Sequence, residues 1–252
     1  MDFSSDSPIL QHKDFLYKLR DSYNFYIDHE IFQCDEYKEN NIAYIVESGQ
    51  FVSEIVYKFK LMHQEVLSNY KIMLVNDYSL LKLDERVKWS PPSFCWIEEP
   101  SIRDKSRLVS MISSSKQMCD GHKKRLEYVN KYKGKLDLFG RGHSEIEKKE
   151  QGLDGYMFSV AIENDQYGGY FTEKIIDCFA TGTIPIYLGD PQIDRHFNMD
   201  GVIVLNEDFD LDSLTPDLYY SKLDSVRDNF ERSKQFFSAQ NYIYNNYLKD
   251  IQ

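Results

Sequence analysis

The stretch from Tyr156 to Pro191 constrains the fold of this chain more than any other part of the sequence. Met157–Ile162 is an apolar run that predicts a buried strand, and a glycine-containing turn follows it. A helix is predicted to begin at about Thr172, whose hydroxyl can cap it, and to end at Gly182. Ile184–Leu188 then predicts the next buried strand. Strand, helix and strand in this order are typical of a parallel sheet with crossover helices.

The first turn of this predicted helix carries a residue that does not suit a helix start. Glu173 is favourable there because an acid complements the positive end of the helix, but Lys174 places a cation at the same end. One interpretation is that Lys174 points sideways into solvent. The other is that the helix N-terminus and the ammonium together bind an anion such as a phosphate.

The remaining sequence predicts similar units on both sides of a break at Pro91-Pro92. Before the break, strands are expected at Ile42–Val46 and Ile72–Val75, with an amphipathic helix between them. After it, strands and helices alternate to the end of the chain. Small, charged and amide residues follow the predicted strands, where open α/β sheets bind ligands: Glu47, Ser113–Ser115, Gly140-Arg141-Gly142, Glu163-Asn164 and Gly189-Asp190.

About 36 residues of this chain resemble the signature of the α-1,3/4-fucosyltransferases, glycosyltransferase family 10. That signature has an apolar strand ending in Glu-Asn, then Tyr-Val-Thr-Glu-Lys, a helix, and Gly-x-x-Pro-x-Tyr-x-Gly-x-Pro. The matching residues are Glu163-Asn164, Tyr170-Phe171-Thr172-Glu173-Lys174 and the run from Gly182 to Pro191. Phe171 and Ile162 depart from the family's usual Val and Phe, and neither is a polar position.

The resemblance implies an α/β fold of the GT-B type, with two Rossmann-like domains facing a cleft. We expect a reduced N-terminal, acceptor-side domain over residues 1–100 and a C-terminal domain binding a GDP-sugar over residues 101–252. One domain with an elaborate N-terminal cap is the alternative.

The resemblance also implies roles for individual residues of the donor site. Arg125, three residues before Tyr128-Val129, and Lys174 correspond to the contacts with the donor diphosphate, and Glu173 to the contact with the nucleotide ribose. Asn164 and Tyr170 would line the donor pocket, and Glu163 is either part of it or structural. A guanidinium suits this task because it can bind a phosphate through two parallel hydrogen bonds.

Transfer with inversion needs a base on the acceptor side to remove the proton of the attacking hydroxyl. In the family a glutamate of the N-terminal domain is this base, and Glu47 matches it best by position. Glu98 and Glu99 are the alternatives, since both lie near the break between the domains.

No metal site is predicted. The 4 cysteines have no Cys-x-x-Cys spacing and the 6 histidines form no His-x-x-x-His pair. Asp208, Asp210 and Asp212 match Asp-x-Asp twice, the pattern with which other glycosyltransferases bind a divalent cation. They also precede a predicted helix, where acids and a cap are favourable, and we prefer that interpretation.

The sequence thus predicts an inverting transferase that needs no cofactor and moves fucose from GDP-fucose to a glycan hydroxyl. The alternatives are a transferase of another GDP-linked 6-deoxy sugar, a metal-dependent transferase, and a non-catalytic module that binds a glycan or a nucleotide. A net charge of −11 argues against a nucleic-acid partner. We find neither a signal peptide nor an apolar run of ~18 residues, and expect a cytoplasmic protein without an integral membrane segment.

Overall fold

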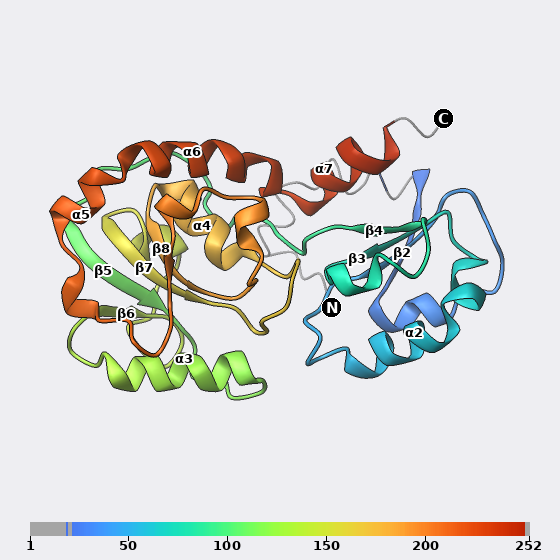
Figure 1. The fold of residues 1–252 in the computed structure, drawn as a ribbon, viewed down its shortest axis with the longest axis horizontal. Helices are drawn as coiled ribbons and strands as arrows, with labels where there is room; N and C mark the ends of the chain where they lie inside the picture. The colour runs from blue at the N-terminus through green and yellow to red at the C-terminus, as the bar shows by residue number, and fades with distance from the viewer. Residues whose placement is uncertain (1–18, 20–21, 250–252) are drawn as a thin grey trace.

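The computed structural model describes residue 19 and residues 22–249. They form two parallel sheets with helices packed around each, in two lobes that lie side by side (Figure 1). The first lobe contains the four strands that precede residue 100, and the second lobe contains the five strands that follow it. This is the α/β arrangement of two Rossmann-like sheets that the sequence predicts.

The first sheet has the order β1-β2-β3-β4, and neighbouring strands are parallel throughout. Its strands are β1 (Asn24–Ile27), β2 (Asn41–Ile45), β3 (Ile72–Val75) and β4 (Val87–Trp89). Every residue of β2 and β3 is buried, as expected for parallel strands that are covered on both faces. Helix α2 (Ser53–Leu67) and the 3-10 helix η2 (Asp28–Phe32) supply side chains to the cluster on one face.

The other face of the first sheet is covered by the end of the chain. Helix α7 (Ala239–Ile243) and the following π-helical turn η9 (Tyr244–Leu248) bring Ile243 and Leu248 onto β2 and β3. In Figure 1 these C-terminal helices lie over the first lobe, although they follow the second lobe in the sequence. The predicted division into residues 1–100 and 101–252 separates the two sheets. It does not account for α7 and η9, which follow the second sheet in the sequence but pack on the first.

The second sheet has the order β6-β5-β7-β8-β9, again with parallel neighbours. Its strands are β5 (Arg107–Ile112), β6 (Asp137–Phe139), β7 (Tyr156–Ile162), β8 (Ile184–Leu188) and β9 (Ile203–Val204). The packed helices are α3 (Asp120–Lys131), α4 (Glu173–Thr181), α5 (Pro216–Ser221) and α6 (Leu223–Ser233). The chain leaves β5 and β7 in opposite directions, so the carboxyl ends of these two strands form the crevice where such sheets bind ligands.

The unit predicted from Tyr156 to Pro191 is confirmed. The strand β7, the helix α4 and the strand β8 occupy the predicted positions, and the side chain of Thr172 caps α4. Gly182 ends the helix with a φ of 72°, a left-handed conformation that glycine adopts at little cost.

Two strands of the first lobe were not predicted. The sequence favours a helix around Phe15–Tyr26; residues 15–18, 20 and 21 lie outside the described residues, but Asn24–Ile27 is a strand. It pairs with β2 through backbone hydrogen bonds that no local pattern encodes. Strand β4 is only three residues long, too short to show a period in the sequence.

The lobes meet around Trp89, at the end of β4. Its indole nitrogen donates to the carbonyl of Gly169 at 2.9 Å, and its ring stacks on His196 with centroids 4.5 Å apart. Nearby, the backbone N–H of Tyr78 donates to the carbonyl of Gly168 at 3.0 Å. A glycine is needed in this turn, because a Cβ on Gly169 would lie 2.8 Å from the Trp89 indole nitrogen. The contact fixes the carboxyl end of the first sheet against the loop that precedes α4.

Candidate active site

The N-terminus of α4 is fastened to the end of β7 by a buried acid. Glu163 accepts hydrogen bonds from the backbone N–H of Thr172 at 2.9 Å and from its hydroxyl at 2.7 Å. The Glu163 side chain is 0% exposed. The structure therefore gives Glu163 a structural part, holding the cap residue of the helix, which is one of the two roles that the sequence left open.

Lys174 does not point into bulk water. Its ammonium donates to the Thr172 hydroxyl at 3.0 Å and to Glu173 at 3.2 Å, and lies 3.4 Å from Glu163. The side chain is 20% exposed and lines a pocket at the carboxyl ends of β5 and β7. The positive end of the helix dipole and the ammonium of Lys174 therefore both favour an anion in this pocket.

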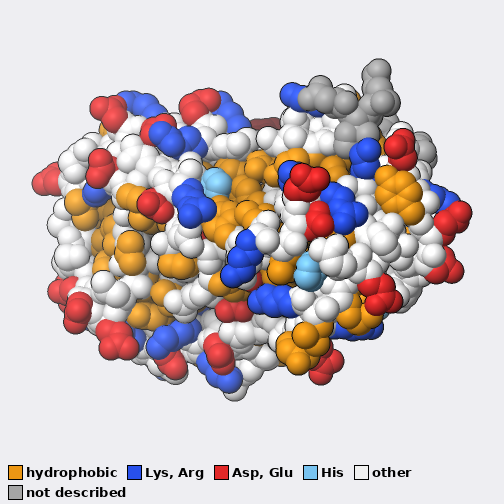
Figure 2. Space-filling model, turned by 45° about the vertical axis from the view of Figure 1, so that its right-hand side comes forward, with side chains coloured by type: hydrophobic (Ala, Val, Ile, Leu, Met, Phe, Trp, Pro, Cys, Tyr) orange, Lys and Arg blue, Asp and Glu red, His pale blue; other side chains and the backbone are white. Residues whose placement is uncertain are grey.

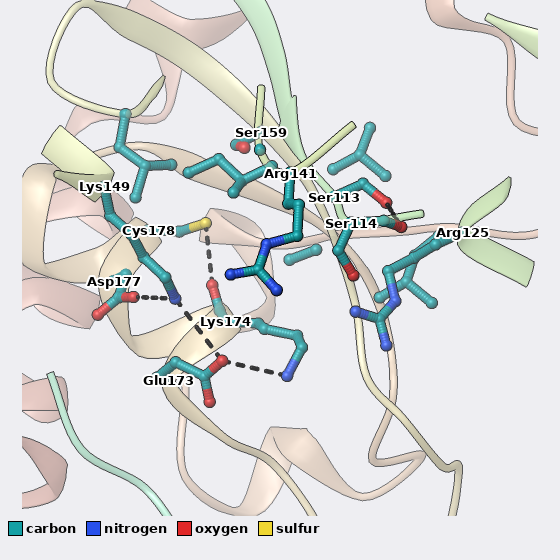
Figure 3. A pocket seen from close by; sticks show the side chains of 16 residues that line it. Ser113, Ser114, Arg125, Arg141, Lys149, Ser159, Glu173, Lys174, Asp177 and Cys178 are labelled. Carbon is teal, nitrogen blue, oxygen red and sulfur yellow. Dashed lines mark hydrogen bonds and ion pairs between the residues drawn. The ribbon is translucent and has the colours of Figure 1, made fainter. Parts of the chain in front are cut away.

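This pocket has a volume of about 240 Å³ and is shown in Figure 3. Four basic and two acidic side chains line it: Arg125, Arg141, Lys149, Lys174, Glu173 and Asp177. The volume is below the roughly 300 Å³ at which pockets for whole small molecules begin, so it fits a part of a nucleotide-sugar better than all of it. In a chain with a net charge of −11, so many cations around one pocket favour an anionic ligand.

Arg125 reaches the pocket from α3 and is 8% exposed. Its guanidinium donates to the carbonyl of Gly121 at 3.1 Å and to the side-chain oxygen of Asn164. Burial lowers the pKa of Arg125, but an arginine remains charged. The helix can come this close only because residue 121 is glycine, since a Cβ there would lie 2.1 Å from the carbonyl of Glu163.

Asn164 and Tyr170, predicted to line the donor pocket, lie beside it rather than on its wall. Asn164 is tied to Arg125, and the backbone N–H of Gly121 donates to its carbonyl at 3.2 Å. Tyr170 is 3% exposed, with its ring 5.1 Å from that of Tyr167. Burial, and after it the charge of Glu163, raise the pKa of Tyr170 far above its usual value, so the side chain stays a neutral phenol.

Two charged residues of the pocket were not predicted. Lys149 approaches Asp177 at 2.7 Å and Glu173 at 3.6 Å, and the Asp177 side chain is only 1% exposed. Burial raises the pKa of Glu173, but Lys174 and Lys149 outweigh it and hold that pKa well below its usual range. Lys149 lies in a charged run that resembles a solvated loop in the sequence, so nothing there pointed to the pocket. Asp177 could have been found, because its i,i+4 spacing from Glu173 places both acids on the same face of the helix.

Arg141 extends into the pocket from the loop after β6. Gly140 and Gly142, with φ of 110° and 88°, hold this loop in conformations that glycine allows. Figure 3 shows the guanidinium between Lys149 and Arg125, and no ion pair of the described residues includes it. The sequence placed Gly140-Arg141-Gly142 at a strand end without assigning it a role; the structure makes Arg141 a candidate for binding an anion.

Glu47 lies in the first lobe, two residues after the end of β2, whereas the pocket is built from the second lobe. The loop that follows it is held to the second lobe, because Gly49 donates to the Tyr167 hydroxyl at 3.2 Å and Gln50 to Asp165 at 3.1 Å. Burial and then the charge of Asp28 raise the pKa of Glu47, while Lys174 lowers it. The charge of Lys174, in the second lobe, thus acts on Glu47, in the first.

The two alternative bases lie elsewhere. Glu98 and Glu99 are both exposed, and Glu98 forms an ion pair with Lys148 at 2.7 Å. None of the three acids considered from the sequence, Glu47 included, lines the pocket at the ends of β5 and β7. Glu47 differs from the other two because it is half-buried and the charge of Lys174 acts on it.

The Asp-x-Asp aspartates act as caps and surface charges. Asp210 caps the 3-10 helix η7 (Leu211–Ser213) by accepting from the backbone N–H of Asp212, and Asp212 pairs with Lys135. Within residues 19 and 22–249, no group of three or more His, Cys, Asp or Glu side chains is arranged to hold a metal ion. Asp210 is thus a cap, but of a three-residue turn; the helix that follows, α5, begins at Pro216 and is capped by Thr215.

The face drawn in Figure 2 shows how charge is distributed over the molecule. Several Lys and Arg side chains lie along the middle of this face beside exposed hydrophobic atoms, and the acidic side chains are mostly spread over its outer parts. No helix among the described residues is both long and apolar enough to cross a bilayer.

Residues 102–247, more than half of the chain, match the family model described as "Glycosyltransferase family 10 (fucosyltransferase) C-term". The chain belongs to glycosyltransferase family 10. The matched region contains the whole second lobe from β5 onward, including every residue of the basic pocket.

Two relatives of this chain show how local the sequence similarity is. The alpha-(1,3)-fucosyltransferase FucT of Helicobacter pylori is 45% identical over 53 residues, which are 21% of this chain and 11% of that protein. A putative fucosyltransferase-like protein of Arabidopsis thaliana is 33% identical over 73 residues, 28% of this chain and 14% of that protein. The matched segments therefore span only a small part of both relatives.

Solved structures of an alpha1,3-fucosyltransferase are similar to this family 10 chain over most of its length. One covers 79% of this chain and 66% of its own, with a TM-score of 0.49 at 17% identity. A second, with GDP, covers 84% and 75%, with a TM-score of 0.46 at 16% identity.

Proposed function

We propose that this family 10 chain transfers fucose from GDP-fucose to a hydroxyl of a glycan acceptor, with inversion, in α-1,3 or α-1,4 linkage. The observation that carries the proposal is the convergence of Arg125, Arg141, Lys149 and Lys174 on one pocket at the switch point of the second sheet. In an acidic chain, such a pocket is suited to an anionic leaving group.

The diphosphate of the donor would be held by Arg125 and Lys174. Both are anchored by the second lobe, Arg125 through Gly121 and Asn164 and Lys174 through Thr172, so their positions are set before a ligand arrives. Preorganised cations stabilise the charge that develops on the leaving diphosphate at little cost of reorganisation. Lys174 and Lys149 keep Glu173 ionised. Its carboxylate would accept hydrogen bonds from the hydroxyls of the nucleotide ribose.

Glu47 would act as the base. Inversion requires the acceptor to attack from the side opposite the leaving group, so base and diphosphate-binding cations belong on opposite walls of the site. Glu47 comes from the first lobe, and the cations come from the second. Its raised pKa suits a general base better than that of an ordinary exposed carboxylate.

Basic side chains would take over the task that a divalent cation performs in the Asp-x-Asp enzymes. The proposal therefore predicts that EDTA leaves the rate of transfer unchanged within about twofold. Loss of activity in EDTA, restored by Mg²⁺ or Mn²⁺, would favour the metal-dependent alternative.

The decisive experiment measures release of GDP from GDP-fucose, GDP-mannose and GDP-rhamnose with a panel of galactose- and N-acetylglucosamine-containing acceptors. We expect acceptor-dependent turnover of GDP-fucose and at least about tenfold slower turnover of the other two donors. Preferred turnover of another GDP-linked 6-deoxy sugar would change the donor assignment. GDP binding without turnover of any donor would instead indicate a binding module.

A further inference from the structure

Asp28 has an unusual backbone conformation beside the proposed base. It follows β1 directly and has a φ of 52°, the only positive φ at a non-glycine position in the described part of the chain. Aspartate tolerates the left-handed region better than most residues but still adopts it rarely. Conformations of this kind are concentrated at functional sites, where the surrounding structure maintains them.

The carboxylate of Asp28 holds the backbone that carries Glu47. Its Oδ1 accepts a hydrogen bond from the N–H of Val46 at 2.9 Å and from the N–H of Glu47 at 3.3 Å. These are the first two residues after β2, which ends at Ile45. Asp28 therefore fixes the direction in which the chain leaves the sheet at the proposed base.

The carbonyls of the same two residues are held from the other side. The Asn76 side chain, after β3, donates to the carbonyls of Val46 at 2.8 Å and of Glu47 at 3.0 Å. The side-chain oxygen of Asn76 in turn accepts from the hydroxyl of Tyr167, in the loop before α4, at 2.9 Å. Three strand ends of the first lobe and one loop of the second thus meet at the peptide units around Glu47.

Charged groups from both lobes face this pair of acids. Burial and then Asp28 raise the pKa of Glu47, and Lys174 lowers it. Burial raises the pKa of Asp28, and the neighbouring His29 lowers it. Tyr170 also lies within electrostatic range of Glu47 and is neutral. Removing the charge of Asp28 would accordingly lower the pKa of Glu47.

We propose that Asp28 is the positioning residue for Glu47: it directs that carboxylate toward the acceptor hydroxyl by clamping the backbone at the end of β2. The proposal rests on the proposed function, in which Glu47 is the base. Asp28 itself need touch neither substrate. Its role differs from that of an ordinary loop cap because the residue it fixes is the one that takes the proton.

Two substitutions separate this role from backbone strain. Asp28→Asn keeps an oxygen acceptor and tolerates positive φ, but removes the charge. Asp28→Gly also tolerates positive φ but removes the acceptor. Glu39→Gln, which removes an 80% exposed acid of the same lobe, is the control for a lost charge.

We expect Asp28→Gly to lower kcat about 30- to 100-fold, because misplacing a catalytic group by about 1 Å costs on this order, with the KM for GDP-fucose unchanged within twofold. Asp28→Asn should keep kcat within about threefold and move the acidic limb of the kcat/KM profile to lower pH. The amide protons of Val46 and Glu47 should exchange faster in Asp28→Gly than in Asp28→Asn. Glu39→Gln should match the wild type.

Failure of this inference can be told apart from failure of the proposed function. If Glu47→Gln is inactive but Asp28→Gly keeps full kcat per folded enzyme, merely melting at a lower temperature, Asp28 is a structural cap and the inference is overturned. If the wild type turns over no acceptor, or Glu47→Gln is as active as the wild type, the proposed function is overturned, and the role of Asp28 with it.

Discussion

In the second lobe, the residues at the start of α4 come from one stretch of chain, whereas in the first lobe the proposed base is held by residues from three separate strand ends. Thr172, Glu173 and Lys174 are consecutive, and Glu163 is only nine residues before Thr172. Around Glu47, by contrast, Asp28 and Asn76 are far apart in the sequence and meet only through pairing of β1, β2 and β3.

The difference teaches how each half of the site is encoded. A helix N-terminus with its cap is specified locally, so its binding site survives as a motif that can be found in the sequence. A residue oriented by long-range strand pairing leaves no such motif, because its partners are set by the fold.

The largest effect that sharpens this comparison is expected from Glu47→Gln. Loss of a general base should lower kcat about 10²- to 10⁴-fold, because the acceptor proton has no positioned acceptor in the transition state. Donor affinity, measured by calorimetry with GDP, should stay the same, since the donor-binding residues lie in the other lobe. Glu98→Gln is the matched control and should keep wild-type kcat; the reverse result would move the base to the linker.

Lys149→Met tests whether the buried ion pairs hold the second lobe's half of the site together. Leaving Asp177 buried without its cation should cost about 3 kcal/mol of unfolding free energy, measured by urea denaturation. Lys149→Met combined with Asp177→Leu should recover much of this loss. Equal stability of Lys149→Met and wild type at pH 8 would show that Asp177 does not depend on Lys149.

The pH dependence of that loss follows from the pKa of Asp177. Burial raises the pKa of Asp177 to about 6 even with Lys149 present, above its value in the unfolded chain. A carboxyl with a raised folded-state pKa contributes stability that is present below the unfolded pKa and is lost as pH rises through the folded pKa. Removing Lys149 raises this pKa further, so Lys149→Met should lose more stability at pH 8 than at pH 5.

Lys174→Ala tests the locally encoded cation. A charge-assisted contact with the diphosphate is worth about 1.5–3 kcal/mol, so we expect GDP-fucose to bind about 10- to 150-fold more weakly in calorimetry. Lys123→Ala on α3, an exposed lysine paired with Asp120 at 3.1 Å, should bind the donor as the wild type does. An unchanged affinity of Lys174→Ala would remove this residue from the donor site.

The smallest effect is expected from Asp210→Ala. Loss of the cap of η7 should cost about 1 kcal/mol of unfolding free energy. Transfer should keep its wild-type rate, with or without added Mg²⁺, because Asp210 caps η7 and is not expected to bind a metal ion. A rate that falls more than tenfold in this variant would restore the metal-binding interpretation of Asp-x-Asp.

Much of the second lobe could be predicted because its elements are long and strongly patterned. The bounds of β8 agree with the prediction, and α4 starts after the predicted cap. What was missed depends on distant partners. Lys149 belongs to the site only because the 3-10 helix η4 (Lys149–Gly152) places it against α4. The cover of the first sheet by α7 and η9 likewise requires chain ends that no local pattern connects.

The sequence by itself determined the α/β class, the helix that begins at Thr172 and the cation in its first turn, because hydrophobic period, capping and helix polarity act over a few residues. Only the tertiary structure decided which cations share one pocket with Lys174 and which acids stand around the base. Those neighbours are brought together by parallel strand pairing and the packing of the two lobes, and their charges interact strongly only once burial has removed the water between them.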